Sequence, residues 1–160
     1  MAEFTVGMIL AEMRNIARSH AALRAKIWRG ESPNHRATPE IGGKVVGLVG
    51  LGNIARRVAG YLSAFGTEII FYDKYVSGHD RYEKVDSLDE LVKRADVISL
   101  HARLTPETAQ MINAHHFSLM KSSAIIVNTA RSGLINEGDL IAALQACLLY
   151  TSPSPRDKRQ

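Results

Sequence analysis

The sequence predicts an α/β fold with a doubly wound parallel sheet, preceded by a long amphipathic helix. Short apolar runs without polar alternation, typical of strands buried on both faces, alternate with helical patterns along the chain. The 160 residues allow one domain of ordinary size, and a hydrophobic share of 46% is enough to fill its core. We therefore expect one globular domain in which right-handed crossovers join the parallel strands.

The leading helix is predicted from its apolar spacing. Apolar side chains recur mostly three or four positions apart while arginines occupy the opposite face, and the apolar set is Val6, Ile9, Leu10, Met13, Ile16, Leu23 and Ile27. This pattern predicts a helix over residues 1–30 that ends near Gly30. Its apolar stripe would be exposed at the edge of the domain and must therefore cover something, and packing against the sheet of its own chain is one way to achieve this.

The strands follow in order after a loop. Residues 30–43 are rich in glycine and proline, which predicts the loop. The runs "KVVGLVG", "TEIIFYD", "DVISLHA" and "SAIIVNTA" then predict four buried strands. Because helical patterns separate these runs, the strands are expected to lie parallel in one sheet.

Helix caps place the connecting helices. One helix follows the first strand directly, and Ser87 with Glu90 three positions later forms a capping box for "SLDELVKRA". Pro106 after Thr105 predicts a helix start in "TPETAQMI", and "AHHFSLM" adds another turn or two. Asn136 is expected to cap the helix in "NEGDLIAALQA".

The carboxyl ends of the strands are where ligands bind in such sheets, and a glycine-rich turn follows the first strand. The string "GLGNIA", residues 50–55, matches G-x-G-x-x-G/A. Gly50 would permit the tight turn, and Gly52 would let the backbone approach a pyrophosphate. The helix that begins near Asn53, with Ile54 in its first turn, would offer free N–H groups and a positive dipole end. A glycine turn in an unrelated α/β protein is the alternative for this motif taken alone.

An aspartate at the next strand end strengthens the dinucleotide interpretation. Asp73 lies 23 positions after Gly50, where a carboxylate can accept hydrogen bonds from ribose hydroxyls and repel a 2′-phosphate. The sequence therefore predicts NAD rather than NADP. A turn or helix-cap aspartate is the alternative, and Lys74 leaves NADP open because a cation there would tolerate the phosphate.

Composition excludes several other functions. The formal charge is +4, of which the last five residues supply +2 (three basic, one acidic), so no nucleic-acid surface is expected. The start lacks the pattern of a signal peptide or membrane span, and we expect no membrane partner and a cytoplasmic location. A single cysteine, Cys147, permits no intramolecular disulfide and no cysteine metal cluster, and no metal site is expected.

Four segments together carry a family resemblance. "VVGLVGLGNIARRVA", "FYDKY", "ADVISLHARLTPET" and "SSAIIVNTARSGLINEGDLIAAL" resemble the Rossmann-type NAD-binding domain of the D-isomer-specific 2-hydroxyacid dehydrogenases. The likeness covers roughly residues 2–146, and "NTARSGLINEGDL" is its most specific part. It implies NAD as cofactor, with Ala102, Thr129 and Ala130 beside it, a 2-hydroxy or 2-oxo acid substrate, and a homodimer that uses the leading helix.

The resemblance also implies a catalytic set of arginine, glutamate and histidine. Only the arginine can be placed, at Arg131, where a guanidinium can hold a carboxylate through paired N–H bonds. The alternative is a solvated arginine in a turn. The family's glutamate and histidine, which exchange the hydroxyl proton, lie downstream of this segment. His101, His115 and His116 are weak substitutes, because lone histidines are more often packed or solvated.

These observations leave two functions and one boundary to test. The first function is an NAD-dependent oxidoreductase domain that is inactive as this fragment, and the second is a non-catalytic NAD(H)-binding or sensing module of corepressor type. The NAD-binding domain is expected over residues 1–146. Residues 147–160, rich in Ser, Pro, Lys and Arg, are expected to be a disordered and non-native tail.

Overall fold

The computed structural model describes residues 1–28 and 39–146. Its helices are α1 (Ala2–Met13), α2 (Ile16–Arg24), α3 (Asn53–Ser63), α4 (Leu88–Arg94), α5 (Ala114–Leu119) and α6 (Glu137–Gln145), and one 3₁₀ turn, η1, spans Ser132–Leu134. Its strands are β1 (Val45–Val49), β2 (Glu68–Tyr72), β3 (Glu83–Lys84), β4 (Val97–Leu100) and β5 (Ile125–Asn128). Two predicted segments, most of the loop 30–43 and the tail 147–160, lie outside the described residues.

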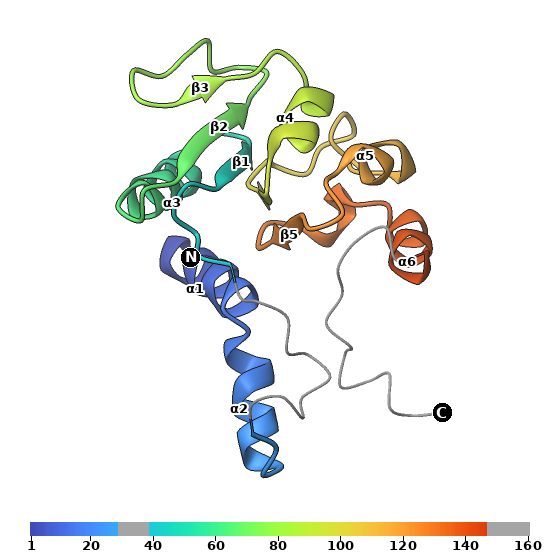
Figure 1. Ribbon diagram of the computed structural model, residues 1–160. Helices are drawn as coiled ribbons and strands as arrows, with labels where there is room; N and C mark the ends of the chain where they lie inside the picture. Colours follow the sequence, from blue (N-terminus) through green and yellow to red (C-terminus); the bar gives the residue numbers. More distant parts are fainter. Residues whose placement is uncertain (29–38, 147–160) are drawn as a thin grey trace.

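The strands form one sheet in the order β3-β2-β1-β4-β5, and every pairing is parallel. The chain therefore runs outward from β1 to β3 and then returns to the other side of β1 for β4 and β5 (Figure 1). This arrangement confirms the predicted doubly wound Rossmann-type fold. The strand order reverses beside β1, which is the position where such sheets bind their ligands.

Two apolar layers cover the two faces of the sheet. Successive strand residues point to opposite faces, so Leu48 and Phe71 pack on the side of α1 and α3, whereas Ile70 and Ile98 pack with Leu91 of α4. All five of these side chains are fully buried. The near-continuous apolar strands of the sequence are thus explained by burial on both faces.

The prediction of one continuous helix over residues 1–30 is wrong, because the leading helical segment is divided into α1 and α2. Asn15 separates them in the left-handed conformation, with φ 54°, and Asn is among the few residues that adopt it readily. The Arg18 side chain fixes the break because it donates to the Asn15 side-chain oxygen and pairs with Glu12 at 2.9 Å. As a result α1 packs against α3 and β5, whereas α2 contains no buried residue and extends away from the sheet (Figure 1).

The predicted helix in "TPETAQMI" is wrong, because residues 106–110 form turns. The Thr108 hydroxyl accepts from the Thr105 N–H at 2.8 Å and donates to the Arg103 carbonyl at 2.7 Å. Gln110 then takes φ 53° and donates its N–H to the Gly133 carbonyl, which directs the chain toward a bridge between Ile112 and Ile135. These side-chain and long-range bonds compete with a helical continuation.

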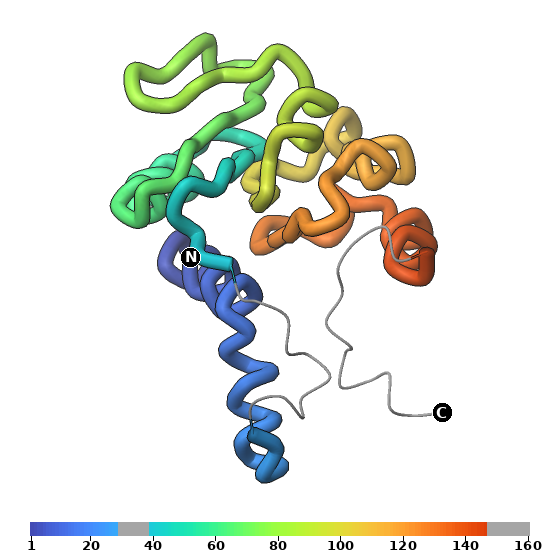
Figure 2. Tube along the Cα trace, viewed as in Figure 1, coloured from blue at the N-terminus to red at the C-terminus, as the bar shows by residue number. Residues whose placement is uncertain are grey.

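Other local predictions are confirmed. Ser87 accepts from the Glu90 N–H at 3.1 Å, and Asn136 accepts from the Asp139 N–H at 3.1 Å, so both act as helix caps. No sequence pattern predicts β3, a two-residue strand of Glu83 and Lys84 at the edge of the sheet. Figure 2 shows the chain between β2 and β3 as a wide loop at that edge.

Candidate cofactor and substrate site

The glycine turn after β1 needs glycine at Gly50 for two reasons. Its φ is +91°, a conformation that costs other residues about 1–2 kcal/mol. A Cβ at this position would also lie 3.0 Å from the Ala102 nitrogen and 3.2 Å from the His101 carbonyl carbon. The turn is therefore pressed against the end of β4, as the sequence argument for a tight turn requires.

The N-terminus of α3 is open to a ligand. Gly52 is its N-cap and no side chain caps it, while Gly52, Asn53 and Ile54 are exposed. A Cβ at Gly52 would meet nothing within 4 Å, so the space above this residue is free. Exposed N–H groups at the positive end of the helix dipole fit a pyrophosphate. Ala55 is fully buried in the apolar layer that α3 shares with α1 and the sheet.

Asp73 is tied to the glycine turn. One carboxylate oxygen accepts the Leu51 N–H at 2.8 Å, and the other accepts the N–H groups of Tyr75 at 2.8 Å and Val76 at 3.0 Å. Partial burial acts to raise the pKa of Asp73, but the backbone N–H groups outweigh it and hold that pKa below its usual value. The carboxylate is therefore ionised at neutral pH and has lone pairs left for ribose hydroxyls.

Lys74, the residue that left NADP open, has a partner. Its Nζ lies 2.8 Å from Oε2 of Glu107 in the turn segment after β4. The hydrogen bond between them raises the pKa of Lys74 and lowers the pKa of Glu107. Both side chains are mostly exposed, so the pair is accessible to solvent and to ligands.

The loop after β5 is held by Asn128. Its side-chain nitrogen donates to the Arg131 carbonyl at 2.9 Å, and its side-chain oxygen accepts the Ala130 N–H at 3.0 Å. The Arg131 side chain is exposed and donates to the Ala130 carbonyl at 2.8 Å. The hydroxyl of Thr129 lies 2.8 Å from that of Thr5 on α1, so the leading helix reaches this strand end.

The histidines form two separate arrangements. His101 shares a hydrogen bond of 2.9 Å with the buried Ser99 hydroxyl, and burial lowers the pKa of His101 to about 4, so it is neutral at neutral pH. His115 and His116 lie 2.8 and 3.5 Å from the Asp89 carboxylate, and His115 thus joins α5 to α4. In the described residues, no group of three or more His, Cys, Asp or Glu side chains is arranged so that it could hold a metal ion.

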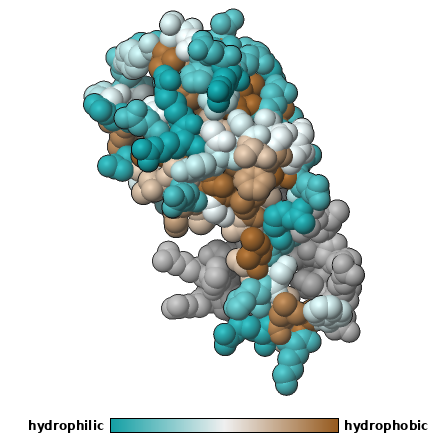
Figure 3. Space-filling model, turned by 90° about the vertical axis from the view of Figure 1, so that its left-hand side faces the viewer, coloured by the Kyte–Doolittle hydropathy of each residue, from teal (hydrophilic) through white to brown (hydrophobic). Residues whose placement is uncertain are grey.

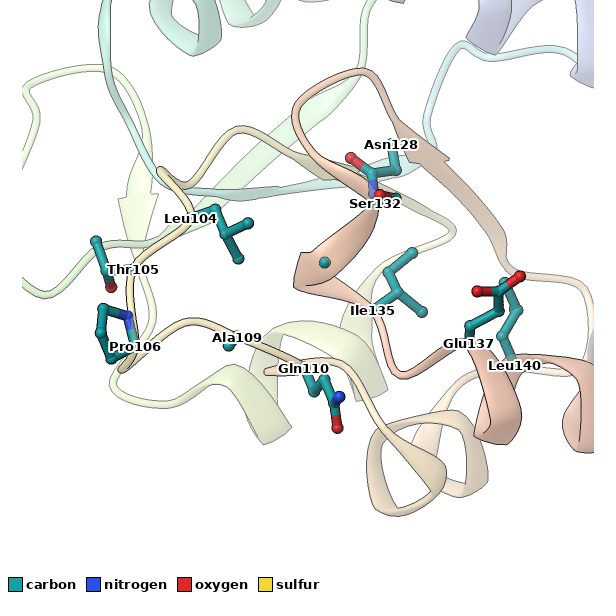
Figure 4. Close-up of a pocket in the computed structure, with 11 residues that line it drawn as sticks. Leu104, Thr105, Pro106, Ala109, Gln110, Asn128, Ser132, Ile135, Glu137 and Leu140 are labelled. Carbon is teal, nitrogen blue, oxygen red and sulfur yellow. The ribbon is translucent and has the colours of Figure 1, made fainter.

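A cavity of about 900 Å³ opens beside the loop of Arg131 (Figure 4). It is bounded by the segments after β4 and β5 and by the start of α6, and its lining residues are Leu104, Thr105, Pro106, Ala109, Gln110, Asn128, Ser132, Gly133, Ile135, Glu137 and Leu140. The lining combines aliphatic side chains with a few polar groups, as is common in small-molecule sites.

The structure brings the predicted residues to one edge of the sheet. Gly50, Gly52, Asn53 and Ile54 follow β1, Asp73 follows β2, Ala102 follows β4, and Thr129, Ala130 and Arg131 follow β5. Sequence reasoning missed the contacts of Thr5 and Glu107, because no local pattern links residues so far apart in the chain. None of the helices in residues 1–28 and 39–146 has the length and apolarity to cross a bilayer, and the cytoplasmic location stays a prediction.

The fold and the turn define a Rossmann-type dinucleotide-binding domain, and the comparisons name its family. The sequence matches the NAD binding domain of the D-isomer specific 2-hydroxyacid dehydrogenases over residues 6–150. The chain belongs to this family, and it represents the family's NAD-binding domain. Its cofactor is NAD.

Individual relatives agree with this assignment. The chain is 45% identical to D-3-phosphoglycerate dehydrogenase of Methanocaldococcus jannaschii over 91% of its own length and 28% of the relative. It is 39% identical to C-terminal-binding protein 1 of Caenorhabditis elegans, over 91% of this chain and 21% of that protein.

A solved structure extends the comparison to three dimensions. The D-lactate dehydrogenase of Lactobacillus jensenii, solved with NAD⁺, superposes with a TM-score of 0.82 at 32% identity. The superposition covers 92% of this chain and 44% of that one. The chain thus spans less than half the length of these three proteins.

Proposed function

We propose that this chain supplies the NAD(H) site of an oxidoreductase that interconverts 2-hydroxy and 2-oxo acids. The observation that carries the proposal is the common position of the glycine turn, Asp73 and Arg131 at the carboxyl edge of one parallel sheet. In this arrangement the cofactor lies across the strand ends and the arginine lies at the far end of it.

Each proposed binding residue has a physical task. The turn formed by Gly50 and Gly52, with the N–H groups of Asn53 and Ile54, holds the pyrophosphate. Asp73 accepts the ribose hydroxyls. Three residues with small side chains line the part of the site that holds the nicotinamide and leave room for its ring, namely Ala102, Thr129 and Ala130.

Arg131 is the proposed substrate-binding residue. Its exposed guanidinium follows β5, and the Asn128 amide fixes the backbone of the loop that carries it. Substrate binding therefore needs little further ordering of the loop backbone. A guanidinium can hold a carboxylate through two parallel N–H bonds and polarise the neighbouring carbonyl. The nicotinamide supplies or accepts the hydride, and proton exchange requires a further acid–base group.

We therefore expect cofactor binding by the chain without turnover. The neutral His101, with its Nε2 bonded to Ser99, is poorly suited to donate a proton at neutral pH. The family resemblance assigns that step to a glutamate and a histidine downstream of the Arg131 segment. The 160-residue chain should accordingly bind NADH and leave 2-oxo acids unreduced.

Fluorescence titration with NADH, followed by assay with glyoxylate and hydroxypyruvate, tests the proposal. Asp73→Asn should weaken NADH binding, whereas Asp86→Asn, an exposed aspartate before α4, should leave it unchanged. If a folded sample failed to bind NADH, the proposed cofactor site would be contradicted. Turnover by this chain that disappears in Arg131→Ala would contradict its proposed inactivity while supporting the role of the arginine.

A non-catalytic NAD(H)-binding or sensing module is the second candidate. The similarity to C-terminal-binding protein 1 favours it, although dehydrogenases are more similar to this chain. The two candidates differ in the intact protein, because only the dehydrogenase should oxidise NADH when a 2-oxo acid is added. NADH binding with no oxidation in the intact protein, across a panel of 2-oxo acids, would favour the module.

We also propose that the intact protein is a homodimer that buries α1 and α2. Both helices expose large apolar side chains, namely Met1, Phe4, Met8, Ile16 and Leu23. Figure 3 shows hydrophobic side chains on the projecting helical part and on the body above it. Exposed apolar side chains gathered on one part of a protein are typical of interfaces. Multi-angle light scattering should give the mass of two chains, and Phe4→Glu should reduce it to one.

A further inference from the structure

The ion pair between Lys74 and Glu107 spans the glycine turn. Lys74 follows β2 and Glu107 lies in the turn segment after β4, yet these two strands are not neighbours in the sheet. β1 lies between them and pairs with both, so a bond between the two loops passes over the carboxyl end of β1. That end carries Gly50, and the pair therefore borders the proposed adenosine and pyrophosphate site.

Lys74 is placed where a cation affects the choice of cofactor. It directly follows Asp73, whose carboxylate is tied to the Leu51 N–H at 2.8 Å and faces the ribose in the proposed site. NADP differs from NAD by a 2′-phosphate on that ribose. A free ammonium next to Asp73 would attract the phosphate and offset the repulsion from the carboxylate.

Glu107 removes this attraction. Its Oε2 holds the Lys74 Nζ at 2.8 Å, and the charge of the carboxylate offsets that of the ammonium and adds to that of Asp73. We infer that Glu107 is a specificity-determining residue that disfavours NADP(H) by engaging Lys74 across the glycine turn. The inference rests on the proposed cofactor site and adds a residue from the β4 loop to it.

An exposed ion pair of this kind also has a purely structural interpretation. Such pairs contribute little to folding, and a structural pair would affect NADH and NADPH equally or not at all. The specificity role instead requires an effect confined to NADPH that depends on Lys74. Binding of the two cofactors to matched variants separates the two cases.

The test measures the dissociation constants of NADH and NADPH by fluorescence for the full 160-residue chain and its variants. Glu107→Gln should tighten NADPH binding by about fivefold and change NADH binding by less than about twofold. In Lys74→Gln/Glu107→Gln the gain should disappear, because the freed ammonium is absent. Raising the salt concentration should shrink the gain, since the charges are exposed.

Glu68→Gln is the matched control. It makes the same charge change in another exposed ion pair, with Arg94 at 3.2 Å, at the opposite end of β2. It should leave both dissociation constants unchanged. An NADPH gain in this control would show that net charge alone is responsible and would overturn the inference.

The remaining outcomes are also distinguishable. Equal changes for NADH and NADPH in Glu107→Gln, or a gain that persists in the double variant, would overturn the inference and leave the cofactor site standing. If the folded parent chain binds neither NADH nor NADPH, the proposed site itself fails.

Discussion

His101 should make the folded state sensitive to mild acid. Burial lowers its pKa from 6.5 to about 4, while the unfolded chain keeps a value near 6.5. Between these two values the unfolded state binds a proton that the folded state does not. The contribution of His101 to the free energy of unfolding is therefore fully present above pH 6.5 and decreases as the pH falls toward 4.

The size of the effect follows from the pKa difference. One pKa unit corresponds to about 1.4 kcal/mol, so the full difference is worth on the order of 3 kcal/mol. About 2 kcal/mol of this should be lost between roughly pH 7 and pH 5. Burial also lowers the pKa of His116, which adds a dependence on pH in the same direction.

Urea unfolding followed by circular dichroism, at several pH values in that range, measures the loss. The His101→Gln variant keeps a polar group near the Ser99 hydroxyl and cannot be protonated, so it should lose about 2 kcal/mol less than the parent over this range. The contribution of His116 is common to both proteins and cancels in the difference. The lowered pKa values of Asp73, Asp89 and Asp96 affect stability at lower pH, as the pH falls through and below the ordinary aspartate value of 3.8. Identical pH dependence in the two proteins would refute the reasoning.

Three substitutions test other parts of the structure by the same unfolding assay. Gly50→Ala should lower the free energy of unfolding by at least about 1–2 kcal/mol, because Gly50 has a φ of +91° and lies close to the Ala102 nitrogen. As a control, Gly60→Ala in α3 should be neutral or stabilising, because the space around a Cβ there is open. Ser87→Ala should cost about 1 kcal/mol by removing the cap of α4, and restoration by Ser87→Asp would confirm the cause. Thr5→Val should cost about 1–3 kcal/mol, since it leaves the Thr129 hydroxyl without its 2.8 Å partner; an unchanged unfolding energy would show that the contact is dispensable.

The sequence was sufficient for β1, β2, β4 and β5 because their signals are local. Each of these four strands is an apolar run, and the caps at Ser87 and Asn136 are encoded within four residues. The helix predicted in "TPETAQMI" is wrong because the structure of this segment depends on contacts with residues distant in the sequence. There the backbone of Gln110 bonds to Gly133, a residue of a later segment, and the local preference for a helix start at Pro106 is outweighed.

The break at Asn15 shows a further limit of periodicity. Apolar residues continue at helical spacing on both sides of it, so the spacing predicts one helix, but spacing records which face is apolar and not whether the backbone is continuous. The left-handed turn changes the direction of the chain. It leaves α1 packed on the body and α2 outside it.

The candidate site also combines features that local sequence patterns predict with features that they do not. Gly50, Gly52 and Asp73 could be predicted because a phosphate turn and the next strand end are linked by a short crossover. The contacts around them could not be predicted, since Thr5 of α1 meets Thr129, and Lys74 meets Glu107, only after the fold has brought distant segments together. The residues proposed to bind the cofactor are thus constrained by local geometry. The proposed specificity residue Glu107 comes from the loop after β4, and the order of strands in the sheet places β4 next to β1.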